Sequence, residues 1–224
     1  MFKTLVDMKK TFSLFPLLFL FLLSASSYAQ SIGPKAGVNI ASYAGDDQFD
    51  DDAFGSNTGL QFGVAAEIPI SGRFAIQPEL LYLQKGAASE VDFLGITTRV
   101  ENVLNYLEIP LLAKISLTDS PTKVYVTAGP SIGFGLGGKV VTSVGDMEEE
   151  VDVDFEEDEL NSFDLSLAFG AGVQFEVGPG QLFVDARYLL GLGGLDDSEP
   201  EADQIDIFNR GIGASVGFLF PIGQ

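Results

Sequence analysis

Apolar residues alternate with small or polar residues, with a period of two, in eight separate segments between residue 34 and the end of the chain. In the clearest segment, residues 124–136, the even positions hold Val, Ala, Pro, Ile, Phe and Leu, and the odd positions hold Tyr, Thr, Ser and Gly. A period of two is typical of β-strands, because successive side chains point to opposite faces. The pattern therefore predicts strands with one apolar face and one small, polar face.

The eight predicted strands cover approximately residues 34–43, 58–68, 74–85, 103–115, 124–136, 164–177, 181–192 and 211–220. Their less apolar face is rich in Gly, Ala and Ser, which suits the narrow interior of a closed barrel. A surface in water would carry more Lys, Glu, Thr and Gln. The predicted fold class is all-β, an eight-stranded antiparallel up-and-down transmembrane β-barrel. A soluble β-sandwich is the alternative, since alternation alone fits both.

The connections between the predicted strands alternate in length. Residues 71–73, 118–121 and 178–180 are short links with Gly or Pro, as tight hairpins require, and the odd-numbered links are long. In an up-and-down barrel the odd-numbered links share one end, as the long external loops of membrane barrels do. These four predicted loops are acidic, and their carboxylates are Asp46, Asp47, Asp50, Asp51, Asp52; Glu90, Asp92, Glu101; Asp146, Glu148, Glu149, Glu150, Asp152, Asp154, Glu156, Glu157, Asp158, Glu159; and Asp196, Asp197, Glu199, Glu201, Asp203, Asp206.

The first 29 residues have the pattern of a signal peptide. Lys9 and Lys10 precede an apolar run over residues 14–23, and Ser27-Tyr28-Ala29 offers the small residues of a cleavage site. A run of this length is too short to span a bilayer as a helix, which needs about 20 residues. We therefore predict a removed signal peptide over residues 1–29 and a barrel domain over residues 30–224. Met8 is an alternative initiator to Met1.

Composition excludes several classes of chemistry. The chain has no Cys and no His, which rules out disulfides, thiolate or imidazole metal sites and Ser-His or Cys-His catalysis. Without residues 1–29, 9 basic and 31 acidic residues remain, a net charge of −22. This charge argues against nucleic acid as a partner, because phosphate binding requires a basic surface. We expect no cofactor, no bound metal in the barrel and no enzymatic activity.

Eight charged residues fall on the predicted inward face of the strands, and we expect them to pair, because an unpaired buried charge costs several kcal/mol. They are Lys35, Glu67, Glu79, Lys85, Glu108, Lys114, Asp185 and Arg187. The simpler interpretation is a structural ladder that fills the lumen, and the alternative is a gated, narrow ion path. An enzyme would need Glu79 and Glu108 as a carboxylate pair, but Lys85 and Lys114 on the same face favour ion pairing.

Divalent cations are hypothetical partners of the acidic loops, since carboxylate oxygens are ligands that Ca²⁺ prefers. The first loop, residues 45–52, lacks the ligand spacing and the closing Glu of an EF-hand. A solvated, mutually repelling run of charge is therefore the interpretation that we favour there.

Several motifs resemble the small outer-membrane β-barrel proteins often labelled porin-family. They are residues 33–39 (GPKAGVN), 77–82 (QPELLY) with 85–86, 106–114 (YLEIPLLAK), 128–130, 170–173, and 187–188 with 191–192. The resemblance implies a bacterial outer-membrane barrel with outer-membrane lipid around it and with insertion by the outer-membrane assembly machinery. We predict a structural or surface-interaction role with a lumen largely plugged by side chains, and the alternatives are a narrow porin-like channel for small solutes or an accessory component of a protein secretion apparatus. The protein partner is unknown.

Overall fold

The computed structural model describes residues 30–45, 55–93, 95–145, 147–158, 160–195 and 207–222, and in these ranges the chain forms ten strands. The strands are β1 (Gln30–Gly45), β2 (Gly55–Ser71), β3 (Phe74–Lys85), β4 (Ala87–Phe93), β5 (Ile96–Ser116), β6 (Thr122–Val144), β7 (Met147–Val153), β8 (Phe163–Val177), β9 (Gly180–Gly194) and β10 (Ile207–Ile222). The same ranges hold no helix that is long and apolar enough to cross a membrane. The predicted signal peptide lies outside the described residues.

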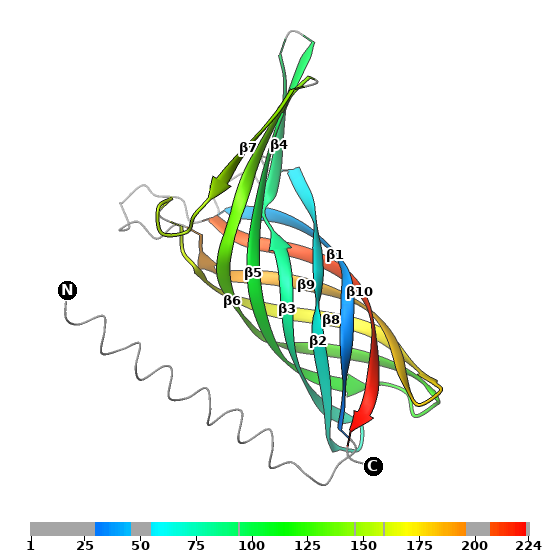
Figure 1. The fold of residues 1–224 in the computed structure, drawn as a ribbon. Helices are drawn as coiled ribbons and strands as arrows, with labels where there is room; N and C mark the ends of the chain where they lie inside the picture. The colour runs from blue at the N-terminus through cyan, green and yellow to red at the C-terminus, as the bar shows by residue number, and fades with distance from the viewer. Residues whose placement is uncertain are drawn as a thin grey trace, which may run out of the picture.

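Eight of these strands close into a ring of antiparallel pairs, in the order β1, β2, β3, β5, β6, β8, β9, β10 (Figure 1). The first and last strands close the ring, and their register runs from Gln30 opposite Ile222 to Gly45 opposite Ile207. The structure thus confirms the predicted all-β class and the eight-stranded, up-and-down barrel. Closure leaves these strands without unpaired edges along their barrel portions.

Three short turns lie at one end of the barrel, which we call the turn end, together with the start of β1 and the end of β10 (Figure 1). Two of these turns contain a glycine with positive φ, Gly72 at 54° and Gly178 at 58°. L-residues with a side chain rarely adopt this conformation, whereas two-residue hairpins require it. The opposite end, the hairpin end, carries the longer connections.

The predicted second and third acidic loops are corrected by the structure, which shows that they are largely hairpins. Glu90, Asp92 and Glu101 lie in the β4–β5 hairpin, and the segment from Glu148 to Asp152 lies in β7. The sequence analysis missed these strands because the alternation of apolar and polar residues shifts by one position wherever the pairing between strands is irregular. One such break is Gly86, between β3 and β4, with a φ of 129°. The predicted first and fourth loops lie outside the described residues.

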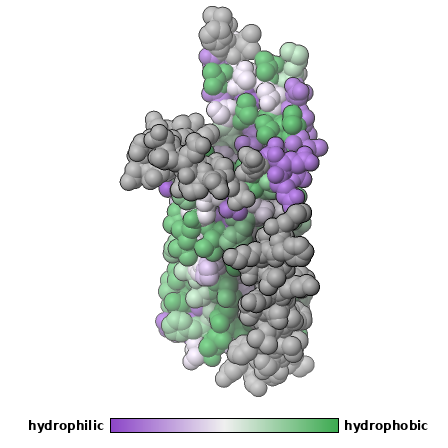
Figure 2. All heavy atoms as spheres, turned by 90° about the vertical axis from the view of Figure 1, so that its left-hand side faces the viewer, coloured by the Kyte–Doolittle hydropathy of each residue, from purple (hydrophilic) through white to green (hydrophobic). Residues whose placement is uncertain are grey.

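The outer wall of the barrel is apolar, as the alternation predicts. On β2 the exposed fractions of Leu60, Phe62 and Val64 are 57%, 52% and 44%, and on β10 that of Ile212 is 58%. Figure 2 shows apolar residues over much of the visible wall and hydrophilic residues gathered above it. A monomer in water rarely exposes so large an apolar surface, whereas hydrocarbon around a membrane barrel covers it.

Glycines on the inner face make room for large side chains in the lumen. A Cβ atom at Gly217 would lie 2.3 Å from the ring of Phe183, and one at Gly172 would lie 2.5 Å from the ring of Tyr125. Both rings are almost completely buried. The small residues therefore do not leave an empty interior, because aromatic rings from neighbouring strands occupy the space.

Candidate functional site in the barrel lumen

Charged side chains fill the lumen in three layers along the barrel axis, which we call the lower, middle and upper tiers, counted from the turn end. All eight residues predicted for the inward face are buried, with exposed fractions between 1% and 9%. The alternation of each strand places them there, since inward positions recur at every second residue. Each strand supplies residues at different heights, so the tiers combine distant parts of the sequence.

The lower tier joins Lys114 of β5 to Glu67 of β2 and Gln174 of β8. The ammonium nitrogen of Lys114 lies 2.6 Å from Glu67 Oε2 and 2.6 Å from Gln174 Oε1. It also lies 3.9 Å from the centroid of the Tyr125 ring, within the range of a cation–π contact. The cation is therefore held on three sides, by a carboxylate, an amide oxygen and an aromatic face.

The middle tier is centred on Glu79 of β3. Arg187 approaches its carboxylate with both terminal nitrogens, Nη1 at 2.7 Å from Oε2 and Nη2 at 2.9 Å from Oε1. Lys35 Nζ lies 3.3 Å from Glu79 Oε1 and 3.1 Å from Asp185 Oδ2. Gln77 donates a further hydrogen bond of 2.6 Å to Glu79. Two cations and two anions thus neutralise one another in a bidentate, geometrically defined cluster.

The upper tier is centred on Lys85 at the end of β3. Its ammonium nitrogen lies 2.9 Å from Glu108 Oε2 and 2.6 Å from Asp164 Oδ2, and 4.7 Å from the centroid of the Tyr106 ring. Ser131 donates a hydrogen bond of 2.8 Å to the other oxygen of Glu108. Two carboxylates share one cation here, so this tier carries a net negative charge.

Sequence reasoning left Asp164 out of the charged set, although its position in the alternation pointed inward. It is the first inward residue of β8, at the boundary with a connection that was expected to be a loop. With Asp164 the buried set has five carboxylates and four cations. Glu79 and Glu108, the pair that a catalytic interpretation would need, lie in different tiers, and each contacts a cation.

An aromatic side chain closes the upper tier toward the hairpin end. Phe155, just after β7, is buried, and its ring meets that of Tyr106 edge-to-face at 5.5 Å between centroids. Leu104 completes this cluster, and Leu160 packs against it. Sequence reasoning missed Phe155, because a single aromatic residue within an acidic segment shows no periodicity.

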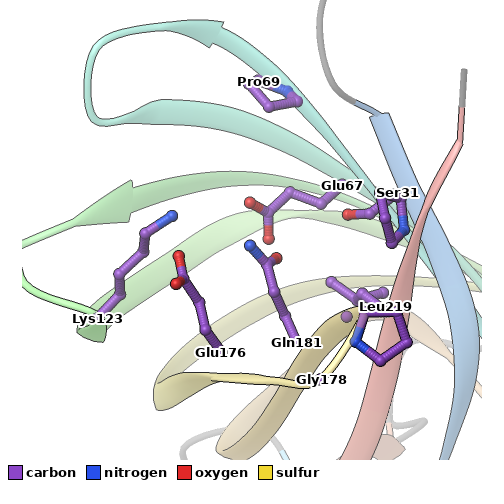
Figure 3. A pocket seen from close by; sticks show the side chains of 11 residues that line it. Ser31, Glu67, Pro69, Lys123, Glu176, Gly178, Gln181 and Leu219 are labelled. Atoms are coloured by element: carbon purple, nitrogen blue, oxygen red, sulfur yellow. The ribbon is translucent and has the colours of Figure 1, made fainter. Parts of the chain in front are cut away.

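An open pocket of about 360 Å³ lies at the turn end, below the lower tier. Figure 3 shows Lys123, Glu176 and Gln181 pointing into the same space as Glu67. The side-chain amide of Gln174 donates to Gln181, which links this mouth to the lower tier. Among the buried charged residues that the structure describes, Glu67 is the one that lines this pocket.

A family model of the outer membrane protein beta-barrel domain matches residues 28–197. The chain belongs to this family. Its place is the bacterial outer membrane, and the wall of apolar side chains is the surface that meets lipid. The match ends before β10, which nevertheless closes the barrel against β1.

Solved structures with a similar fold include the outer membrane protein OprG from Pseudomonas aeruginosa. It is 12% identical to this barrel over 88% of the chain and 97% of its own, with a TM-score of 0.50. Neisserial surface protein A is 15% identical over 86% of this chain and 99% of its own, with a TM-score of 0.44. Ail, the attachment invasion locus protein of Yersinia pestis, is 14% identical over 86% and 100%, with a TM-score of 0.37. No curated protein matches the chain.

Proposed function

We propose that this outer-membrane barrel has a surface-interaction role and that its lumen does not conduct solutes. The observation that carries the proposal is the three-tier ladder, in which every lumen cation is bound to at least one carboxylate within 3.3 Å. A solute path would have to separate these pairs. The cost is high, because a buried charge that loses its partner destabilises a protein by about 3–5 kcal/mol. Phe155 above and Gln174 below add neutral barriers.

The hairpin end is the surface that faces outside the cell in this proposal. Short turns at one end and long connections at the other are the arrangement of outer-membrane barrels, whose turns are periplasmic. The described hairpins carry a strong excess of negative charge, and the turn end carries Arg73, Lys123, Asp119 and Glu176. The interaction role thus falls to the hairpin end.

Planar-bilayer recording and liposome swelling test the closed lumen. The purified, refolded chain is expected to give no stable single-channel conductance and no swelling with small sugars or amino acids. Glu79→Gln, which unbalances the middle tier, provides the matched variant. A stable conductance in the wild type that changes in size or ion selectivity in Glu79→Gln would establish the narrow channel instead.

Labelling on intact cells tests the orientation. The natural chain has no Cys, so a single Cys at Glu149 in β7 or at Pro179 in the β8–β9 turn gives an unambiguous signal. A membrane-impermeant maleimide is expected to label Glu149→Cys and to leave Pro179→Cys unlabelled until the cells are lysed. The reverse pattern would contradict the proposed external face.

A further inference from the structure

Four strand segments continue beyond the barrel at the hairpin end as one antiparallel sheet, which we call the projecting sheet: β4, residues 96–105 of β5, residues 137–144 of β6, and β7 (Figure 1). Across it, Val91 of β4 lies opposite Thr98 of β5, Thr98 opposite Val144 of β6, and Val144 opposite Met147 of β7. The ladder is continuous over all four strands. It is therefore one hydrogen-bonded sheet rather than a set of independent loops.

The two faces of the projecting sheet differ in chemistry. One face continues the lumen side of the barrel and carries mainly Val and Thr, namely Val91, Thr98, Val100, Val140, Thr142, Val144 and Val151, together with Glu149. The other face carries Glu90, Asp92, Arg99, Glu101, Lys139, Glu148, Glu150 and Asp152. This face holds both cations of the sheet and most of its carboxylates.

Both cations of the projecting sheet, Arg99 and Lys139, form ion pairs within the sheet. Arg99 lies 2.5 Å from Glu101 Oε1 and 3.4 Å from Glu90 Oε2, and Lys139 lies 2.6 Å from Glu150 Oε1. In the part of the chain that the structure describes, Glu148, Glu149 and Asp152 form no ion pair. All three are on β7, and the fourth unpaired carboxylate of the projecting sheet, Asp92, is on β4 and accepts a hydrogen bond from Thr97. Most of the unpaired negative charge therefore lies along β7.

β7 is also an edge of the sheet. Within the described ranges it pairs with β6 on one side and with no strand on the other. The amide N–H of Gly145 donates a hydrogen bond to the carbonyl oxygen of Thr97 in β5. The backbone groups of the odd-numbered residues of β6 therefore bond to β5, and those of the even-numbered residues bond to β7. Met147, Glu149 and Val151 then bond to β6, whereas the backbone groups of Glu148, Glu150 and Asp152 face outward.

An outward row of backbone donors and acceptors is a template for an added strand. A second copy of this chain is a poor occupant, because like charges directly opposite one another destabilise a strand pair. A basic segment has the complementary charge, since Lys or Arg opposite Glu148, Glu149 or Asp152 would form the ion pairs that β7 lacks. Backbone pairing and charge therefore select the same kind of partner.

We propose that the free edge of β7 binds an extended, basic segment of a partner protein, which adds a fifth strand to the projecting sheet. This inference rests on the proposed surface-interaction role and specifies the place and the chemistry of the interaction. The main-chain bonds supply affinity, and the acidic side chains select against neutral and acidic strands.

The test uses the full mature chain in nanodiscs of zwitterionic lipid, with empty nanodiscs as the blank. The probe is a fluorescent nine-residue peptide in which Lys alternates with Val, and fluorescence anisotropy reports binding. Saturable binding is expected, with slowed amide hydrogen exchange at Glu148, Glu150 and Asp152. A peptide with Glu in place of Lys, and a Lys-Val peptide with a central Pro, are each expected to bind at least tenfold more weakly.

Two substitutions at Asp152 separate charge from backbone pairing. Asp152→Asn removes the carboxylate and keeps the amide N–H, whereas Asp152→Pro removes both and leaves the bonds of β7 to β6 in place. We expect a loss of about threefold in affinity for Asp152→Asn, since an exposed ion pair contributes little to binding, and at least a tenfold loss for Asp152→Pro. Equal affinities of the two variants, or tight binding of the Pro-containing peptide, would reduce the interaction to nonspecific charge attraction and overturn the added strand.

Chemical cross-linking of the purified chain tests whether a second copy of the chain, rather than a basic segment, pairs with the edge of β7. Cross-links between β7 strands of two copies, in place of peptide binding, would also overturn the inference. The lumen and orientation experiments are independent of this one. If the peptide does not bind, while the lumen proves non-conducting and the hairpin end proves external, the strand-addition site is ruled out and the proposed function still stands.

Discussion

Lys85 and Asp164 are 79 residues apart in the sequence, and Lys85 Nζ lies 2.6 Å from Asp164 Oδ2 inside the barrel. Lys85 is the last residue of β3, and Asp164 is the second residue of β8. The two strands are not neighbours in the ring, so their side chains meet across the lumen. The contact ties opposite walls of the barrel together at the hairpin end.

Removal of Lys85 is expected to destabilise the barrel strongly. Lys85→Met leaves Glu108 and Asp164 buried without a cation, and breaking a buried pair by removing one partner costs about 3–5 kcal/mol. Urea unfolding in micelles, followed by tyrosine fluorescence and by heat-modifiable migration on a gel, measures the change. Arg99→Met removes a cation from a partly exposed pair and is the control, with an expected loss of about 0–1 kcal/mol. Similar losses in both variants would contradict the role of the upper tier.

Gly135 and Phe155 are expected to be energetically coupled. The three atoms nearest to a Cβ at Gly135 all belong to the Phe155 ring, at 2.6 to 2.8 Å. Gly135→Ala should therefore cost ~1–3 kcal/mol through overpacking, and Phe155→Ala ~3–5 kcal/mol through the lost ring. In the double variant the Ala at position 135 should add almost nothing, because the ring is gone. Additive losses in this double-mutant cycle would show that Phe155 does not occupy the mouth of the lumen.

Arg73 is expected to control the titration of Asp119 at the turn end. The side-chain hydrogen bond from Arg73 holds the pKa of the Asp119 carboxyl below its ordinary value. A lowered pKa means that the contact stabilises the fold above the ordinary pKa of Asp and that this contribution is lost as the pH falls through the lowered pKa. In Arg73→Gln the pKa of Asp119 should rise, as NMR titration of the carboxyl carbon would measure. An unchanged titration midpoint would mean that the pair does not form in solution.

A charged side chain in place of Phe62 is expected to destabilise the barrel, because the side chain at this outward position of β2 contacts lipid hydrocarbon. Phe62→Arg should lower the free energy of unfolding by about 2–4 kcal/mol in lipid bilayers, as charged residues near the midplane of membrane barrels do. Val91→Arg on the projecting sheet is the matched control, since Val91 is also exposed, at 61%, but lies beyond the barrel wall. Its expected effect is within ~0.5 kcal/mol. Equal penalties at the two positions would argue against a lipid-facing wall.

The structure confirms the parts of the fold that follow from local periodicity. The outward positions of residues 124–136, 164–177 and 211–220 are the more exposed ones, and the alternation had assigned them to the apolar face. The β4–β5 and β6–β7 hairpins were not predicted, although Glu90-Val91-Asp92 and Glu150-Val151-Asp152-Val153 alternate within them. Their acidic composition favoured loops, and the breaks near Gly86 and Gly137 interrupted the count of strand positions.

The sequence by itself determined the barrel portions of the eight ring strands and which of their side chains point into the lumen, because a strand places every second side chain on the same face. Only the tertiary structure decided which charges meet. Lys35 and Asp185 are 150 residues apart, and the 3.1 Å between their charged atoms depends on ring closure and on the stagger of eight strands. Periodicity along one strand carries no information on its height relative to another, so the tiers, the Phe155 cap and the free edge of β7 emerge only when the barrel is assembled.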